Sequence, residues 1–334
     1  MKKTPKLLIL AGTVLAFLFL FGIIFYNNFI KKSIYEENSQ HLLSTYEQVD
    51  KTFTMFVQHN WNALSDWSNN LQYLDDTENM KTLWYEFARR KDAWQYQDFY
   101  MFNENCDFIT AAGRDGNAPN IQGIFLDMYA TGQPVISSYI ASDSNRRIVF
   151  ALPMDVPYTI NGVTYSGLAV SYNNDVVEKL IAGNIYQGQS DCYILTSDGN
   201  VLLSLEPKTE FLQHISNLFD FLNNYTDMTE TEITDLKKNI KNVSTGSLQC
   251  RYNKKTYYLV YEPTGINDWT IVGIIHNDVV DASMRRMQFI TIVLILILNG
   301  CIALLLIGTV FVLMDSRLRM KEHEQMILLK RKEL

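Results

Sequence analysis

The sequence has little that breaks a helix. Its 334 residues include only 7 proline and 16 glycine residues, and none of these falls between residues 23 and 112. Apolar side chains make up 47% of the chain, which excludes a disordered or collagen-like protein. We therefore expect a folded protein that contains an unusually long helical segment.

Motifs of enzyme chemistry are also missing. The sequence has no Gly-x-Ser-x-Gly elbow, no Walker loop and no two histidines four residues apart. Residues 113–117 are predicted to form a turn, because their glycine spacing does not fit a phosphate loop and no Lys-Ser or Lys-Thr follows. No catalytic residue, metal site or cofactor is predicted, so enzyme activity stays uncertain.

Cysteine is scarce as well. Of the four cysteines, Cys301 lies in a long apolar run, which leaves Cys106, Cys192 and Cys250 elsewhere. Three is an odd number, and no pair has the spacing of zinc ligands. We expect buried free thiols, with one disulfide and one leftover thiol as the open alternative.

Two apolar runs are long enough for a membrane. Residues 7–26 and residues 289–314 contain no charge, and each run can cross a hydrocarbon core of roughly 30 Å as a helix. No small-x-small cleavage signal follows the first run, which favours an uncleaved anchor over a signal peptide. The sequence thus predicts two transmembrane helices and the lipid bilayer as a partner.

Charge indicates the orientation of the chain. The predicted ends, residues 1–6 and 315–334, carry nine lysines and arginines, whereas the stretches on the inner sides of the two runs carry four. This bias predicts that both termini are cytoplasmic and that residues 27–288 lie outside the cell membrane. The region between the runs has a net charge of −12, which argues against nucleic acid as a partner.

A long amphipathic helix is predicted after the first run. Its apolar residues lie three, four or seven positions apart, with Asn60 in the single gap of the stripe. The stripe covers at least 33 residues, or roughly 50 Å of helix. It consists of Leu42, Tyr46, Val49, Phe53, Val57, Leu64, Trp67, Leu71 and Leu74.

From residue 98 the hydrophobic pattern has a period of two, which predicts strands. The order strand–turn–strand, helix and three strands occurs twice, and Asn-Asp-Val-Val follows an apolar strand at residues 174–177 and again at 277–280. Two related α+β modules are predicted, with chance similarity as the alternative. The predicted strand segments are 98–110 (two strands around a turn), 133–141, 147–153, 165–172, 191–196, 201–205, 247–252, 256–262 and 269–275.

Several of these segments resemble a known family. Residues 193–202 (YILTSDGNVL) are similar to a strand, Asp-Gly turn and strand of its membrane-proximal module, and residues 133–139 and 149–153 are similar to strands of its distal module. Residues 261–269 resemble its closing hairpin. With two spans and a long helix, the chain resembles the double Cache (tandem PAS-like) extracytoplasmic sensor domain over roughly residues 30–284. The resemblance implies a distal module within residues 30–182 and a proximal module at 183–284.

The resemblance also implies a ligand site. In this family a small organic molecule binds the distal module between its central sheet and a cap of helix and loop. Tyr139 is implied as a lining residue, and Asp127, Tyr129, Arg147 and Tyr172 are candidate neighbours, each weighed against a role in the core or on the surface. Amino-acid-binding members carry an Arg-x-Trp pair before the strand at 133–141. Residues 124–129 contain neither residue type, which argues against an amino-acid ligand.

The C-terminal residues are typical of a signalling helix. Residues 314–334 contain no Gly or Pro, and Leu313, Met320, Ile327 and Leu334 lie seven apart, as on one edge of a coiled coil. By resemblance, this helix belongs to a homodimer and is cut before a histidine kinase of a two-component system or, as second choice, a diguanylate cyclase. The alternative is a complete membrane-anchored binding or adaptor protein.

Overall fold

The computed structural model describes most of the chain. The described residues are 4–71, 73, 85–86, 88–91, 93–110, 113–118, 122–141, 145–181, 189–204 and 215–332. The chain divides into two compact units, residues 1–279 and residues 280–334. The first unit contains the long helix and both sheets.

The first unit begins with α1 (Thr4–Leu71), a single helix of 68 residues. The predicted stripe is confirmed on this helix from residue 42 to residue 71, where its side chains are buried. Asn60 is fully buried too, because its side chain bonds to another part of the fold. Leu74, the last residue of the predicted stripe, lies outside the described residues.

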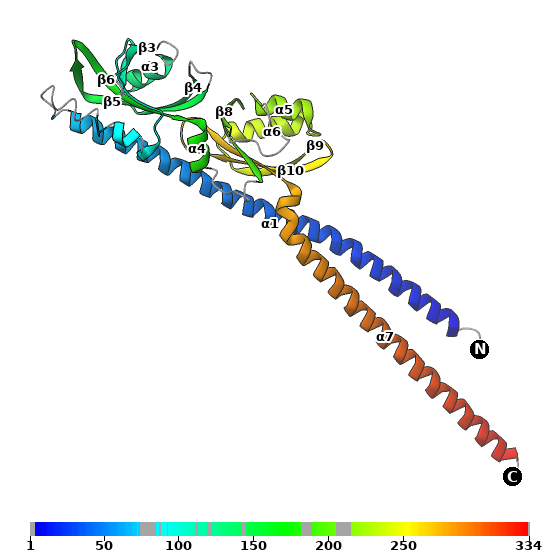
Figure 1. The fold of residues 1–334 in the computed structure, drawn as a ribbon. Helices are drawn as coiled ribbons and strands as arrows, with labels where there is room; N and C mark the ends of the chain where they lie inside the picture. Colours follow the sequence, from blue (N-terminus) through cyan, green and yellow to red (C-terminus); the bar gives the residue numbers. More distant parts are fainter. Residues whose placement is uncertain are drawn as a thin grey trace. The chain divides into compact units, whose positions relative to one another are not determined.

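The first sheet has six antiparallel strands in the order β3-β2-β1-β6-β5-β4. Helix α3 (Gln122–Thr131) covers one face of the sheet, and α1 runs along the other (Figure 1). Helix α4 (Asn174–Ile181) follows the last strand. The strands are β1 (Asp98–Phe102), β2 (Asp107–Thr110), β3 (Asp115–Asn117), β4 (Val135–Ile140), β5 (Arg146–Ile160) and β6 (Val163–Asn173).

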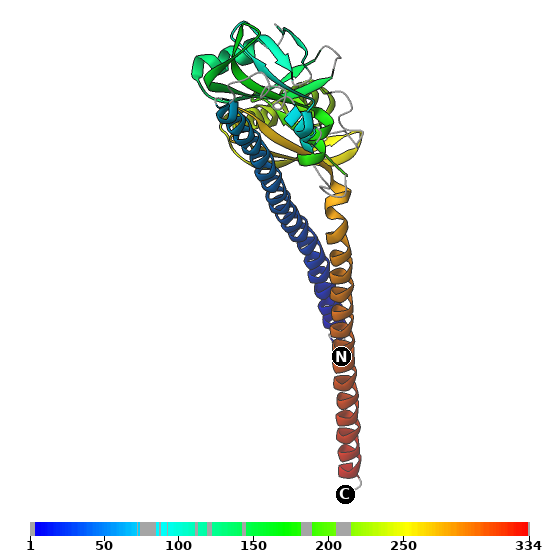
Figure 2. The same ribbon diagram turned by 60° about the vertical axis from the view of Figure 1, so that its left-hand side comes forward.

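The second sheet has five antiparallel strands in the order β8-β7-β11-β10-β9. Helices α5 (Leu218–Tyr225) and α6 (Glu230–Lys241) cover the face that α1 leaves free, as both views of the ribbon show (Figures 1 and 2). The strands are β7 (Ser190–Leu195), β8 (Val201–Ser204), β9 (Gly246–Tyr252), β10 (Lys255–Pro263) and β11 (Thr270–His276).

Most of the sequence-based expectations for the fold are met. The α+β class, the long N-terminal helix and the two antiparallel sheets are confirmed. The predicted strands appear near their expected bounds, except that the strand predicted at residues 147–153 runs on to Ile160. The prediction of a plain turn at residues 113–117 was wrong in part, since residues 115–117 form edge strand β3 by pairing with β2. Helix α3 lies where the repeated order predicts a helix in the first module, although its bounds were not predicted. Cys106, Cys192 and Cys250 are buried and free.

The two sheets contact each other directly. One guanidinium nitrogen of Arg146 on β5 donates to the carbonyl oxygens of Val201, at 2.5 Å, and Leu202, at 3.1 Å, both on β8. The Asn267 amide donates to the carbonyl oxygen of Ile136 on β4 at 3.1 Å. These bonds join the strands at one edge of the first sheet to the second module.

The second unit is almost entirely helical. Helix α7 (Asn277–Lys332) begins directly after β11 and runs for 56 residues. Many of its apolar side chains are exposed, for example Phe289, Leu304 and Phe311. Within the part of the chain that the structure describes, no helix meets the combined requirement of length and apolarity for a membrane span. The side chains of most of residues 7–26, the first predicted span, lie outside that part.

Candidate ligand-binding site

Helix α3 covers the centre of one face of the first sheet, and one end of the same face is polar. Because side chains alternate along a strand, Tyr100 on β1 and Val149 on β5 share the face that α3 covers. Phe125 and Met128 of α3 pack against this face and fill its centre. Asp98 and Arg147, two positions further along the same two strands, continue the face into a polar region.

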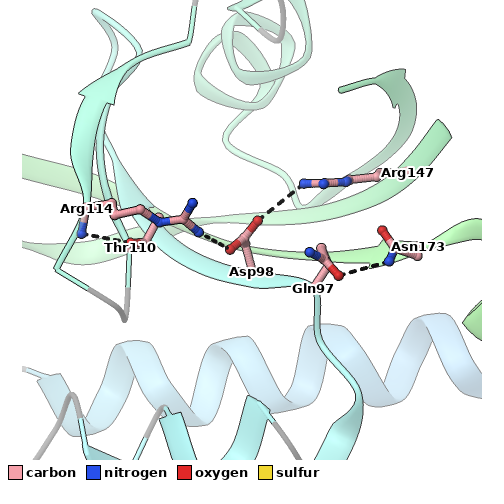
Figure 3. A network of polar contacts seen from close by, with 6 residues as sticks. All are labelled: Gln97, Asp98, Thr110, Arg114, Arg147 and Asn173. Carbon is pink, nitrogen blue, oxygen red and sulfur yellow. Dashed lines mark hydrogen bonds and ion pairs between the residues drawn. The ribbon is translucent and has the colours of Figure 1, made fainter. Parts of the chain in front are cut away.

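An ionic network occupies this polar end. The Asp98 carboxylate accepts hydrogen bonds from the guanidinium groups of Arg114, at 3.0 Å, and Arg147, at 3.3 Å. Figure 3 shows the two arginines reaching Asp98 from opposite sides. The side chains of Asp98 and Arg147 are 17% and 13% exposed, whereas that of Arg114 is 69% exposed. The Asp98–Arg147 pair is therefore the sequestered part of the network.

Neighbouring amides and hydroxyls hold this network in place. The Asn173 amide on β6 donates to the side-chain oxygen of Gln97 at 2.9 Å (Figure 3). The hydroxyl oxygen of Thr110 on β2 accepts from the backbone N–H of Arg114 at 3.0 Å, which fixes the start of the loop that carries this arginine. Each polar residue thus comes from a different strand or from its end, and the sheet sets their spacing.

Two buried hydroxyls lie beside the ionic network. The buried Tyr100 hydroxyl lies within interaction range of the Ser171 and Tyr139 hydroxyls, although no hydrogen bond of good geometry joins it or Ser171 to another described residue. Burial raises the pKa of Tyr100 well above its usual range, and the nearby Tyr139 and Asp98 add to the rise. Buried polar groups are nearly always hydrogen-bonded in native proteins, so two such hydroxyls side by side indicate a place for a polar ligand atom or a water molecule.

Two of the five candidate residues come together here. Tyr139 on β4 is in register with Arg147 on β5, so both lie on the face that α3 covers. Tyr129 of α3 lies on the same face, but it is engaged elsewhere: its hydroxyl donates to the Phe102 carbonyl oxygen at 3.3 Å and accepts from Ser166 at 3.0 Å. Burial raises the pKa of Tyr129 to about 12, partly offset by the Ser166 bond.

The other two candidates lie apart from this group. The Asp127 side chain is exposed on the outer side of α3. Tyr172 is fully buried on the opposite face of the sheet, where its hydroxyl donates to Asn60 of α1 at 2.7 Å and its ring packs edge-on against Phe56. A ligand on the α3 face therefore does not reach Tyr172.

Sequence reasoning missed Asp98, Tyr100 and Arg114. Asp98 and Tyr100 were recognisable as alternate residues of a predicted strand, the same alternation that places Arg147 and Val149 together on β5. The sequence alone did not show that β1 and β5 both pair with β6, because this follows from the order of strands in the sheet. Arg114 stands in a glycine-containing stretch whose local pattern indicated only a turn.

The second module contains a cavity of its own. It measures about 260 Å³ and lies between the β7–β8 turn and the helices α5 and α6. Three lysines and two aspartates contribute to its lining, and the Lys241 ammonium forms an ion pair with Asp198 at 3.3 Å. Polar and charged side chains make up most of its lining. The lining residues are Ser197, Asp198, Asn217, Phe219, Asp220, Lys237, Lys238 and Lys241.

Among known proteins, the chain is similar to solved structures in its fold. No family model and no curated protein matches the chain. The sensory domain of the Campylobacter jejuni chemoreceptor Tlp3 (CcmL) with isoleucine bound superposes with a TM-score of 0.51 at 12% identity, over 76% of this chain and 98% of that one. The ligand-binding domain of the Pseudomonas aeruginosa PAO1 amino acid chemoreceptor PctB in complex with L-Arg gives 0.54 at 14% identity, over 75% and 92%.

A third match comes from a different class of receptor. An extracellular domain attributed to a histidine kinase, mmHK1S-Z3, gives a TM-score of 0.54 at 14% identity, over 74% of this chain and 97% of that one. These identities are low, so the similarity concerns the fold. The chain has the fold of the extracellular sensor domains of chemoreceptors and histidine kinases, in agreement with the double Cache resemblance.

Proposed function

We propose that the chain is the input part of a bacterial transmembrane receptor, and that a small organic ligand binds the α3-covered face of the first sheet. One observation carries this proposal. The buried hydroxyls of Tyr100 and Ser171, which make no hydrogen bond of good geometry to a described residue, lie beside the sequestered Asp98–Arg147 pair on that face. A sheltered ion pair with hydroxyl groups beside it suits a site for a polar ligand.

The chemistry of the site favours a ligand with a carboxylate. Arg147 and Arg114 together outweigh the single charge of Asp98, so the network has room for one more anionic group. A ligand that also carries an ammonium group would find a partner in Asp98. Tlp3 with isoleucine and PctB with L-Arg make amino acids the first class to test, although residues 124–129 lack the Arg-x-Trp pair of amino-acid-binding members.

The rest of the chain suits a membrane receptor. The uncharged runs at residues 7–26 and 289–314 would span the bilayer, with both termini in the cytoplasm and residues 27–288 outside. The backbone of α1 continues from the first run into the sensor fold, and α7 leaves it directly after β11. Ligand binding would shift these helices in a homodimer and regulate a cytoplasmic kinase or cyclase, provided that the ligand prefers one helix arrangement.

Thermal unfolding of the purified full chain tests the ligand site. Amino acids and small organic acids are added at millimolar concentration, and a compound that binds the native state raises the Tm. Tyr139→Ala should abolish that rise, since the ring contributes to the site, and the exposed Tyr225→Ala in the second module should leave it intact. A full rise in Tyr139→Ala would move the site elsewhere, with the lysine-lined cavity as the next candidate.

The alternative function is a membrane-anchored binding or adaptor protein without output activity. The two functions differ in what lies beyond residue 334. An immunoblot of the native gene product with an antibody to the sensor region separates them, because a receptor with an output domain runs well above the 38.6 kDa of this chain. Inter-protomer cysteine crosslinking at positions 320, 327 and 334, with and without a binding compound, then tests the movement of the helices.

A further inference from the structure

The contact between α1 and the second sheet is mostly apolar and aromatic. Tyr35 of α1 stacks on Tyr258 of β10 with ring centroids 5.9 Å apart, and Phe53 stacks on Trp269 at 6.2 Å. Gly273 of β11 gives room to the ring of Tyr46, which lies where a side chain at this position would stand. This close packing excludes water from much of the contact.

Two carboxyl groups interrupt this apolar contact. Glu262 lies on the α1 side of β10, because Leu259 and Tyr261 belong to the core on the other face of the sheet. Asp50 lies on α1, one turn before Phe53. Its oxygen Oδ1 is buried and has no hydrogen-bond partner among the described residues.

The charge of Asp50 acts on Glu262, and burial acts on both carboxyl groups. Burial raises the pKa of Glu262 to about 7, and the negative charge of Asp50 contributes to that rise. Burial also raises the pKa of Asp50 to about 6, against the opposing effect of Lys51. Desolvation of a carboxylate and repulsion by a second one both favour the protonated form.

Few other charges act on the pair. On α1, Glu47 adds to the repulsion and Lys51 opposes it, but the Lys51 ammonium is already bonded to Glu47 at 2.6 Å. The charged groups on the neighbouring strands lie away from Glu262. Arg251 of β9 is in register with Thr256 of β10, and His276 of β11 is in register with Tyr257. Both positions come five or more residues before Glu262.

The described charged side chains of β5, α4 and the residues before β11 are exposed or bonded to other partners. Asp268, next to Trp269, is bonded to Ser197. On β5, Arg146 is bonded to β8 and Arg147 to Asp98, and the remaining carboxyl of that strand, Asp155, is exposed. On α4, Asp175 and Lys179 are exposed.

We infer that Asp50 and Glu262 form a proton-dependent contact, which holds α1 against the second sheet in mildly acidic surroundings and loosens it at neutral and alkaline pH. When both carboxyls are protonated, no negative charge remains at this contact. In the ionised pair, two like charges face each other where little water reaches them. The inference does not depend on the ligand site of the first module.

The direction of the pH effect follows from the shifted groups. Both carboxyls have folded-state pKa values above their ordinary values of 3.8 and 4.5. An acid of this kind destabilises the fold when it is ionised, so stability falls as the pH rises from about 4 to about 7 and changes little from this cause above that. Because both side chains are half-buried and keep some access to solvent, the effect is moderate.

The test compares the Tm of the full chain in detergent at about pH 5.5 and about pH 8. The wild type is expected to lose about 3 °C over this interval relative to Asp50→Asn, in which a neutral amide replaces the carboxyl. Glu262→Gln should also reduce the loss, and the double variant should remove what remains, because burial alone keeps the pKa of the other carboxyl raised in each single variant. Asp66→Asn is the control, since this exposed aspartate lies on the same helix away from the contact.

A local measurement decides whether the effect belongs to this contact. Amide hydrogen exchange of residues 46–53, corrected for the intrinsic effect of pH, should increase about threefold or more from the lower to the higher pH in the wild type but not in Asp50→Asn. An equal loss of Tm in the wild type and in both single variants would overturn the inference. So would a lower Tm of Asp50→Asn at the higher pH than the wild type has.

Discussion

The two modules have the same strand order and different interiors. The order β2-β1-β6-β5-β4 of the first sheet matches β8-β7-β11-β10-β9 of the second. In the second module two helices cover the sheet with an apolar layer, and strand residues such as Leu259 and Val272 complete that core. In the first module one short helix covers the centre of the sheet, and the end of the same face carries Asp98 and Arg147.

This difference supports placing the proposed ligand site in the first module. The covered face of the first sheet contains the sheltered Asp98–Arg147 pair, and an ion pair in a folded interior costs stability unless its groups are well bonded. The second module uses its covered face for packing alone, and its own cavity lies at the edge of the helices. The other face of the second sheet packs against α1, and so does the other face of the first sheet.

The largest expected effect concerns how the second sheet holds α1. Gly273→Ala should destabilise the chain by about 2–3 kcal/mol, because the new methyl group would overlap the Tyr46 ring and a buried ring has little room to move. Denaturant unfolding measures the loss. Gly123→Ala is the matched control, since a methyl group there meets no atom within 4 Å and favours helix α3. Equal stability of the two variants would contradict the packing of α1 on this sheet.

The next prediction compares how much Arg147 and Arg114, the two partners of Asp98, contribute to stability. Arg147→Met should cost about 1–2 kcal/mol, because Asp98 loses its sequestered partner and keeps only an exposed one. Arg114→Met removes a pair whose arginine is 69% exposed, and such pairs contribute less than about 0.5 kcal/mol. Urea unfolding of both variants gives the comparison. A larger loss in Arg114→Met would show that the sequestered part of the network has been misassigned.

The long helix and the repeated module could be predicted because their signals are local. The stripe of α1 repeats every three or four residues with no glycine or proline to interrupt it, and each strand shows its own alternation. Helix α3 carries no such signal, as it has no acidic residue in its first turn and no basic one in its last. Strand β3, with three exposed residues, exists only through its pairing with β2.

The site itself depends on distances along the chain that no local pattern reveals. Asp98 meets Arg114 from 16 residues away and Arg147 from 49. Both Arg147 and Tyr172 were candidate neighbours of Tyr139, but Arg147 is in register with Tyr139 and Asn173, whereas Tyr172 is in register with Ile148. A shift of one residue places a side chain on the other face of the sheet, and the register is fixed by the whole sheet.

A third prediction tests that assignment of faces. Tyr172→Phe should cost about 1–2 kcal/mol, because the buried Asn60 oxygen loses its donor. The double variant Asn60→Leu with Tyr172→Phe should recover part of the loss, since both polar groups are then gone. Thermal unfolding with a compound that raises the Tm should show the same rise in Tyr172→Phe as in the wild type. A diminished rise would return Tyr172 to the ligand site.

The smallest effect concerns the start of α6, which covers the second sheet as α3 covers the first. Thr229 and Glu232 form a capping box there: the Thr229 hydroxyl accepts from the Glu232 N–H, and the Glu232 carboxylate accepts from the Thr229 N–H at 2.7 Å. Thr229→Ala should cost about 1 kcal/mol by denaturant unfolding. Thr234→Ala, an exposed threonine in the middle of the same helix, should cost nothing or stabilise slightly, since alanine has the higher helix propensity.

The pH dependence of this loss identifies the box as its cause. The bonds from the Thr229 backbone and side chain lower the pKa of Glu232, so their contribution is complete above the ordinary pKa of glutamate and is lost as the pH falls through the lowered value. The difference in stability between the wild type and Thr229→Ala should therefore shrink on acidification, while that of Thr234→Ala stays constant. A difference that does not change with pH would leave the hydroxyl bond of Thr229 as the whole effect. The carboxylate of Glu232 would then contribute nothing to the start of α6, and α6 would resemble α3, which has no acidic residue in its first turn.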